Sequence, residues 1–194
     1  MVEAAFALAG QPVDLIEASR WSDTDAFAAL ERVNPLGQVP TLVWPDGTVQ
    51  TESIAILIEI ALRFPDAALL PAETVDRAVA LRWLAYLSGN IYAAYNPRDF
   101  PERWIDDPAQ HGALVDGATR RIKQGWEVMA AQFQPRGVFA FGDRPGALDV
   151  AICVMSRWSP RRDWFDIACP GLAALAHAAD DHHVLRPVWS ANFD

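Results

Sequence analysis

The fold of this chain is decided by one stretch, Asn34–Leu42, which reads NPLGQVPTL. Its Asn-Pro and Leu-Gly pairs are typical of a loop, and Val39-Pro40 stands directly before a predicted strand. A proline cannot donate to a strand ladder, so it marks a strand's first residue or an edge. An X-Pro bond here is a candidate for the cis form, which would turn the backbone N–H and C=O of Val39 toward a peptide-like ligand. The alternative is a loop that enters an ordinary hairpin.

A second signal follows the hairpin turn at Asp46-Gly47, where Glu52 and Ser53 precede an apolar helix predicted over Ile54–Phe64. A hydroxyl and exposed N–H groups at a helix N-terminus can take a carboxylate, while Glu52 can pair with an ammonium group. This helix end therefore predicts a site for an α-amino acid group. The alternative is that Ser53 simply caps the helix.

The chain has two parts with different periodicities. Residues 1–64 alternate short elements, which we predict as a helix at Val2–Ala9, a strand at Val13–Ile16, a helix at Asp25–Arg32 and hairpin strands at Thr41–Trp44 and Thr48–Gln50. After a linker at 65–74, residues 75–194 show only helical periods, at Val75–Tyr95, Leu114–Phe133 and Leu148–Trp158, and from Pro170 onward. The sequence predicts a small α/β domain followed by an all-helical one.

The order of NPLGQVPTL, an Asp-Gly hairpin and Glu52-Ser53 before an apolar helix resembles the glutathione-binding half of cytosolic glutathione transferases, particularly the bacterial ones. Phe141–Pro145 followed by Ala147–Ala151 is similar to the family's helix-start motif, although Gly146 stands where Ser or Thr is usual. The resemblance covers essentially the whole chain. It implies an incomplete thioredoxin-like domain at 1–64, a linker at 65–74 and an all-helical domain at 75–194.

The resemblance also implies roles for particular residues in the first domain. The backbone of Val39 would hold the cysteinyl part of glutathione, with Pro40 as the cis-proline. Glu52 and Ser53 would take the γ-glutamyl end, and Gln38 would assist with the glycyl carboxylate. Glutathione is thus the expected co-substrate, and no metal is expected, because the four histidines lack a metal-like spacing with carboxylates.

Family members begin with a strand and a turn that carries a Tyr, Ser or Cys against the glutathione sulfur, whereas Met1 stands where the first helix already starts. Residues 1–10 carry no such group, so the sequence leaves the catalytic residue unknown. Three accounts stay open. The start is misassigned or truncated; a partner chain or another segment covers Val13–Ile16; or the protein is a non-catalytic binder.

Aromatic residues of the second domain are expected to line a site for an apolar co-substrate. The first long helix and the loop beyond it carry Trp83, Tyr86, Tyr92, Tyr95, Phe100 and Trp104. The candidates taken from this set are Trp83, Tyr86, Tyr92 and Trp104. For any one of them, packing in the core is the alternative.

Composition limits the partners. The net charge is −9 and the cationic residues are scattered, so we expect neither nucleic acid nor an anionic membrane surface. No apolar run reaches the roughly 20 residues of a membrane span, and the N-terminus lacks the features of a secretory signal. Cys153 and Cys169 are expected to be buried reduced thiols, with a disulfide between them as the alternative. These features favour a cytoplasmic protein.

The function that the sequence favours is attack of the glutathione thiolate on an apolar electrophile, by a homodimer that pairs through Ile54–Phe64 and the first long helix. A non-catalytic glutathione- or ligand-binding protein of the same fold is the alternative. A bare assembly domain ranks third, because assembly alone does not require Val39, Pro40, Glu52 and Ser53.

Overall fold

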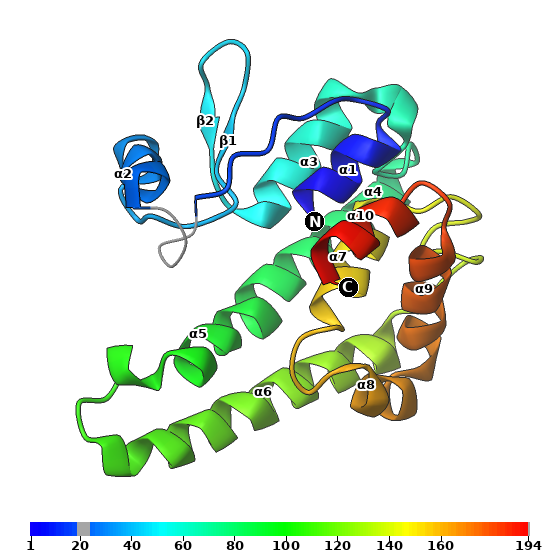
Figure 1. The fold of residues 1–194 in the computed structure, drawn as a ribbon. Coiled ribbons are helices and arrows are strands. Elements are labelled where there is room, and N and C mark those ends of the chain that lie inside the picture. Colours follow the sequence, from blue (N-terminus) through cyan, green and yellow to red (C-terminus); the bar gives the residue numbers. More distant parts are fainter. Residues whose placement is uncertain (19–23, 194) are drawn as a thin grey trace.

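The computed structural model describes residues 1–18 and 24–193 (Figure 1). The first part contains α1 (Val2–Leu8), α2 (Thr24–Val33), β1 (Leu42–Val43), β2 (Val49–Gln50) and α3 (Ser53–Arg63). The second part contains α4 (Thr74–Tyr86), the π-helix η2 (Leu87–Tyr92), α5 (Ala93–Asp99), α6 (His111–Gln132), α7 (Ala147–Met155), α8 (Arg162–Ala168), α9 (Pro170–Asp181) and α10 (Arg186–Phe193). Three 3₁₀ turns join them: η1 (Pro65–Ala67), η3 (Pro101–Arg103) and η4 (Pro108–Gln110).

The sheet of the described residues is a single antiparallel hairpin, in which Leu42 faces Gln50 and Val43 faces Val49. In Figure 1, α2 and α3 lie on opposite sides of this hairpin. The tight turn at Gly47, with φ of +84°, closes the hairpin where the sequence predicts it.

The strand predicted at Val13–Ile16 does not form, so this prediction was wrong. Residues 11–18 have no regular secondary structure, and the side chains of Leu15 and Ile16 are 66% and 82% exposed. A strand needs a neighbour that pairs with its backbone groups, and in the described part of the chain no strand pairs with this segment. An apolar sequence pattern alone was not enough to make a strand.

The core is centred on α7, all of whose residues are buried. Helices α1, α3, α4 and α9 contact it, so elements of both parts of the chain share one hydrophobic core. On the side of the first part, the ring of Phe6 packs against Trp44 and Phe64, with centroids 5.8 and 6.4 Å apart. On the helical side, Trp126 stacks edge-to-face on Phe165 at 4.9 Å. Both parts are therefore anchored to the same central helix.

The start of α7 is fixed by Asp149, which is 1% exposed. Its carboxylate accepts hydrogen bonds from the N–H groups of Gly146 and Ala140, each at 2.8 Å. Burial raises the pKa of Asp149 to about 6, although these two hydrogen bonds oppose the shift. The C=O of Leu69 also accepts from the N–H of Ala147 at 2.8 Å, so the linker between the two parts is tied to this helix start.

Gly146 is the residue that departs from the family's usual Ser or Thr. A Cβ atom built on it would lie 2.8 Å from the C=O oxygen of Leu69. The close approach of the linker therefore explains why a glycine occupies this position.

Candidate functional site

A buried asparagine shapes the loop that carries the candidate glutathione residues. Asn34 is 5% exposed, and its side-chain amide donates to the C=O of Gln38 and to the hydroxyl of Thr41, each at 3.0 Å. Its own oxygen accepts from the N–H of Leu36 at 3.2 Å. Thr41 donates back to the C=O of Gln38 at 2.7 Å. This small network closes the loop, and the sequence reading gave Asn34 no such role.

The loop presents Val39 to solvent. The Val39–Pro40 peptide bond is cis, as the sequence suggests, and the side chain of Val39 is 65% exposed. Within residues 1–18 and 24–193, neither the N–H nor the C=O of Val39 hydrogen bonds to another residue. Both backbone groups are therefore available to a ligand with complementary peptide groups. Gln38, also exposed, is next to them in the loop.

The start of α3 is the second part of the site. The helix begins at Ser53 itself, and Glu52 occupies the N-cap position without a side-chain cap hydrogen bond. The expectation that Ser53 caps the helix was therefore wrong, because a cap residue must precede the first helical residue. The first-turn N–H groups are left for another acceptor, and the hydroxyl of Ser53 stands beside them.

Glu52 has an unusual backbone conformation, with φ of +66° and ψ of 106°. A non-glycine residue in a sparsely populated region of this kind costs on the order of 1–3 kcal/mol. Such strain is concentrated at functional sites, where the surrounding structure imposes it. The side chain of Glu52 is exposed at the open end of α3, where an ammonium group can reach it.

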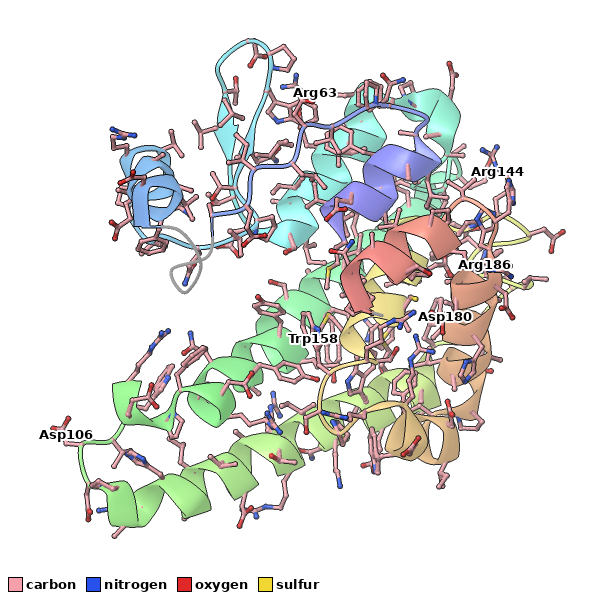
Figure 2. All side chains as sticks on the ribbon, viewed as in Figure 1. Arg63, Asp106, Arg144, Trp158, Asp180 and Arg186 are labelled. Carbon is pink, nitrogen blue, oxygen red and sulfur yellow. The ribbon has the colours of Figure 1, made fainter. Side chains whose placement is uncertain are left out.

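A cavity of about 190 Å³ is lined by Tyr92, Tyr95, Asp99 and Trp158. The indole of Trp158, which is labelled in Figure 2, makes edge-to-face contacts with Tyr92 and Tyr95 at centroid distances of 5.4 and 5.2 Å. Burial raises the pKa of the Tyr92 phenol, and the negative charges of Glu52 and Asp99 raise it further.

Of the four aromatic residues predicted to line a co-substrate site, Tyr92 alone lines this cavity. Trp83 is 1% exposed and packs edge-to-face on Tyr86 at 5.1 Å, within the helical core. The hydroxyl of Tyr86 donates to the C=O of Gly125 at 3.0 Å. Trp104 is 60% exposed and donates through its indole N–H to Asn96 at 3.3 Å, away from the cavity.

The sequence placed Tyr95 among the aromatic residues of this helix without taking it as a candidate, and it gave no role to Asp99 or Trp158. Tyr95 and Asp99 lie on α5, three and seven residues after Tyr92, so helical periodicity places all three on one face. This spacing is the signal that could have identified them. Trp158 comes from a loop after α7, and no local pattern indicates where that loop lies.

The two cysteines lie outside the site. Both are free and fully buried. Burial raises the pKa of Cys153 to about 12 and that of Cys169 to about 11, so neither thiol ionises readily at neutral pH. Among the described residues, no cluster of three or more His, Cys, Asp or Glu side chains is arranged to bind a metal ion. None of the described helices is long and apolar enough to cross a membrane.

Known proteins are similar to this chain over nearly its whole length. Residues 1–62 match the family model of the glutathione S-transferase N-terminal domain. The chain is 29% identical to the uncharacterised GST-like protein YncG of Escherichia coli over 191 residues, which cover 98% of this chain and 91% of YncG. It is 28% identical to maleylacetoacetate isomerase of Pseudomonas aeruginosa over 183 residues, which cover 93% of this chain and 83% of the isomerase.

Among solved structures, a glutathione transferase homologue from Sulfitobacter with bound glutathione superposes with a TM-score of 0.85 at 19% identity, covering 100% of this chain and 92% of the homologue. The fold is therefore a thioredoxin-like domain joined to an all-helical domain. The family model over residues 1–62, the similarity to YncG over nearly the whole chain and the shared fold all support the bacterial-type glutathione S-transferase family.

Proposed function

We propose that the chain binds glutathione and transfers its thiolate to an apolar electrophile. The observation that carries this proposal is the unpartnered backbone of Val39, presented by a cis Val39–Pro40 bond. A cysteinyl residue of glutathione pairs with this N–H and C=O as a short added strand pairs with an edge. The bound glutathione in the Sulfitobacter homologue, which has the same fold, supports this assignment.

The γ-glutamyl end of glutathione is assigned to the start of α3. Its carboxylate accepts from the hydroxyl of Ser53 and the first-turn N–H groups, where the helix dipole favours negative charge. Its ammonium group pairs with the carboxylate of Glu52. The exposed amide of Gln38 donates to the glycyl carboxylate. In this assignment the cysteinyl sulfur of glutathione lies at the Val39 loop and is the group that meets the electrophile.

The aromatic cavity is assigned to the electrophile. Tyr92, Tyr95 and Trp158 offer ring faces and edges that suit a flat apolar group, and its volume of about 190 Å³ fits a single ring. Attack by the thiolate sulfur forms a thioether, and the leaving group departs with the bonding electron pair. Glutathione supplies the nucleophile, so neither cysteine of the chain takes part.

A non-catalytic glutathione-binding protein is the second candidate. The observation that favours it is that neither Cys153 nor Cys169 lies in the site and that the phenol of Tyr92 has a raised pKa, which disfavours a tyrosinate. Such a protein binds glutathione at the same residues but does not lower the pKa of its thiol.

Titration calorimetry with glutathione tests the shared part of both candidates. Ser53→Ala and Glu52→Gln are each expected to weaken binding by about tenfold, because the first removes a hydrogen bond to a carboxylate and the second removes the negative charge that pairs with the ammonium group. Ser190→Ala, at an exposed position on α10, is the matched control and leaves affinity unchanged. Wild-type affinity in both site variants contradicts the assignment.

Conjugation of glutathione to chlorodinitrobenzene then separates the two candidates. Thioether formation that depends on Ser53 supports the transferase. Glutathione binding without turnover, and without a shift of the glutathione thiol pKa, supports the non-catalytic binder.

We further propose that the partner of this chain is a second copy of itself, and that it acts in the cytoplasm, where its free thiols stay reduced.

A groove of about 460 Å³ runs between α5 and α6 and is lined mainly by small residues, among them Gly89, Ala93 and Gly117. Exposed Leu62 on α3 and Val75 on α4 add apolar surface. Gly117→Leu fills the groove and is expected to yield a monomer in sedimentation experiments, whereas Gly171→Leu on α9 does not. An unchanged dimer in the first variant contradicts this surface.

A further inference from the structure

The loop between α7 and α8 carries Trp158, the one wall of the aromatic cavity that does not come from α5 or its junction with η2. Two arginines flank it, Arg157 before the tryptophan and Arg162 at the start of α8. The hydroxyl of Tyr95 donates to the C=O of Ser159 at 2.7 Å, which ties the middle of the loop to α5.

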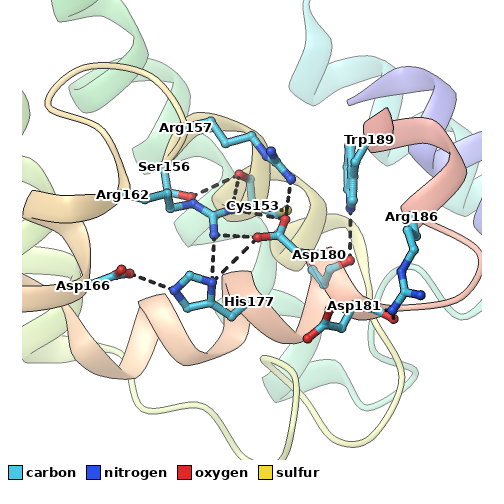
Figure 3. Close-up of polar contacts among 11 residues, drawn as sticks. Cys153, Ser156, Arg157, Arg162, Asp166, His177, Asp180, Asp181, Arg186 and Trp189 are labelled. Atoms are coloured by element: carbon cyan, nitrogen blue, oxygen red, sulfur yellow. Dashed lines mark hydrogen bonds and ion pairs between the residues drawn. The ribbon is translucent and has the colours of Figure 1, made fainter. Parts of the chain in front are cut away.

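The guanidinium groups of both arginines donate hydrogen bonds to one carboxylate, that of Asp180 on α9 (Figure 3). Arg157 donates to Oδ1 of Asp180 at 2.5 Å, and Arg162 donates to Oδ2 at 2.7 Å. Arg162 also donates to the C=O of Cys153 at 3.0 Å, and the Cys153 thiol donates to Oδ1 of Asp180 at 3.1 Å. The carboxylate therefore joins the end of α7 to the start of α8 across the loop.

This arrangement depends on the charge of Asp180. The side chains of Arg157 and Arg162 are 24% and 17% exposed, and the Nε atoms of both are buried without a hydrogen-bond partner. Two partly buried guanidinium groups that share one counter-ion repel each other when that counter-ion is removed. The loop ends then separate, and Trp158 loses its fixed place against Tyr92 and Tyr95.

We propose that Asp180 is a positioning residue for the co-substrate site: by holding Arg157 and Arg162 together, it sets Trp158 as the wall of the aromatic cavity. Asp180 does not line the cavity, and its effect is transmitted through the loop that carries Trp158. The part of this inference that concerns the co-substrate rests on the proposed function.

The test compares Asp180→Asn with Asp180→Glu, which keeps the charge, and with Asp181→Asn as the matched control. Asp181 is the next residue on α9, and its ion pair with Arg186 at 3.6 Å is exposed. Asp180→Asn is expected to raise KM for chlorodinitrobenzene by about tenfold, a change of about 1.4 kcal/mol, while glutathione affinity stays within about twofold. Asp180→Glu recovers part of the loss, and Asp181→Asn has no effect.

Fluorine NMR of protein labelled with fluorotryptophan reads the position of Trp158 independently of turnover, with Trp158→Phe assigning its signal. A shifted or broadened Trp158 signal in Asp180→Asn is expected. If the signal moves but the wild type conjugates no electrophile, the positioning role holds and the proposed transferase activity fails. If the signal is unchanged, the positioning role is overturned. Should Asp180→Asn not fold, Arg157→Lys, which keeps the charge but loosens the contact, takes its place with the same expected changes.

Discussion

The two sides of the proposed binding site are built in different ways. On the first side, Val39 and the start of α3 offer backbone groups and a helix end, held by short elements with several exposed apolar side chains. On the second side, Tyr92, Tyr95 and Trp158 form a wall that stands on a densely packed helical core. Backbone recognition needs a correct local conformation, whereas an aromatic wall needs long-range packing. We therefore expect mutations in the core to disturb the second side more than the first.

The largest effect is expected for Trp126→Ala in the helical core. Trp126 is 1% exposed and stacks on Phe165, so its truncation leaves a cavity and lowers the free energy of unfolding by about 3–5 kcal/mol. Urea denaturation measures this change. If the free energy of unfolding falls by less than about 1 kcal/mol, the second side does not stand on a tightly packed core.

The next effect concerns pH and Asp149, whose folded-state pKa is about 6. A carboxyl whose pKa is raised on folding stabilises the protein most below its unfolded pKa, and this stability is lost as the pH rises through the folded pKa. Relative to Asp149→Asn, the wild type should therefore gain on the order of 2 kcal/mol in unfolding free energy as pH falls from about 7 to about 4. Denaturation of both proteins at the two pH values measures this gain. If the two proteins differ in unfolding free energy by the same amount at both pH values, the prediction is contradicted.

A smaller effect is expected for Gly146→Ser, which restores the residue type usual in the family. The added Cβ meets the C=O of Leu69 at 2.8 Å, so the variant should lose about 1–2 kcal/mol of stability although it gains a capping hydroxyl. Gly171→Ser on α9, where a Cβ meets nothing within 4 Å, is the control for thermal unfolding. A Gly146→Ser protein that is more stable than the wild type would mean that the linker at Leu69 shifts to make room for the added Cβ atom.

The smallest effect is expected for Ile16→Ser on the first side. The side chain of Ile16 is 82% exposed, so the free energy of unfolding should change by less than about 0.5 kcal/mol. Ile56→Val, at a fully buried position on α3, should cost about 0.5–1.5 kcal/mol in the same urea titration. A larger loss for Ile16→Ser than for Ile56→Val would show that residues 11–18 pack in solution.

The sequence predicted the first side better than the second for a physical reason. The cis bond before Pro40 and the hairpin turn at Gly47 are set by residues next to each other in the chain. The place of Trp158 depends instead on Asp180, which is far along the chain, so Trp83 and Trp158 cannot be told apart by local pattern. The strand expected at Val13–Ile16 failed for the same reason, because a strand also depends on a distant partner.

The hydrogen bond from the N–H of Ala147 to the C=O of Leu69 has a consequence for movement between the two halves. Leu69 is 2% exposed and is anchored at the start of the central helix, so the segment that joins the two halves is fixed to the core at this point. A hinge needs residues that are free to change their backbone angles, and Leu69 is not one of them. Rotation of one half against the other would have to break this contact or turn about other residues of the linker.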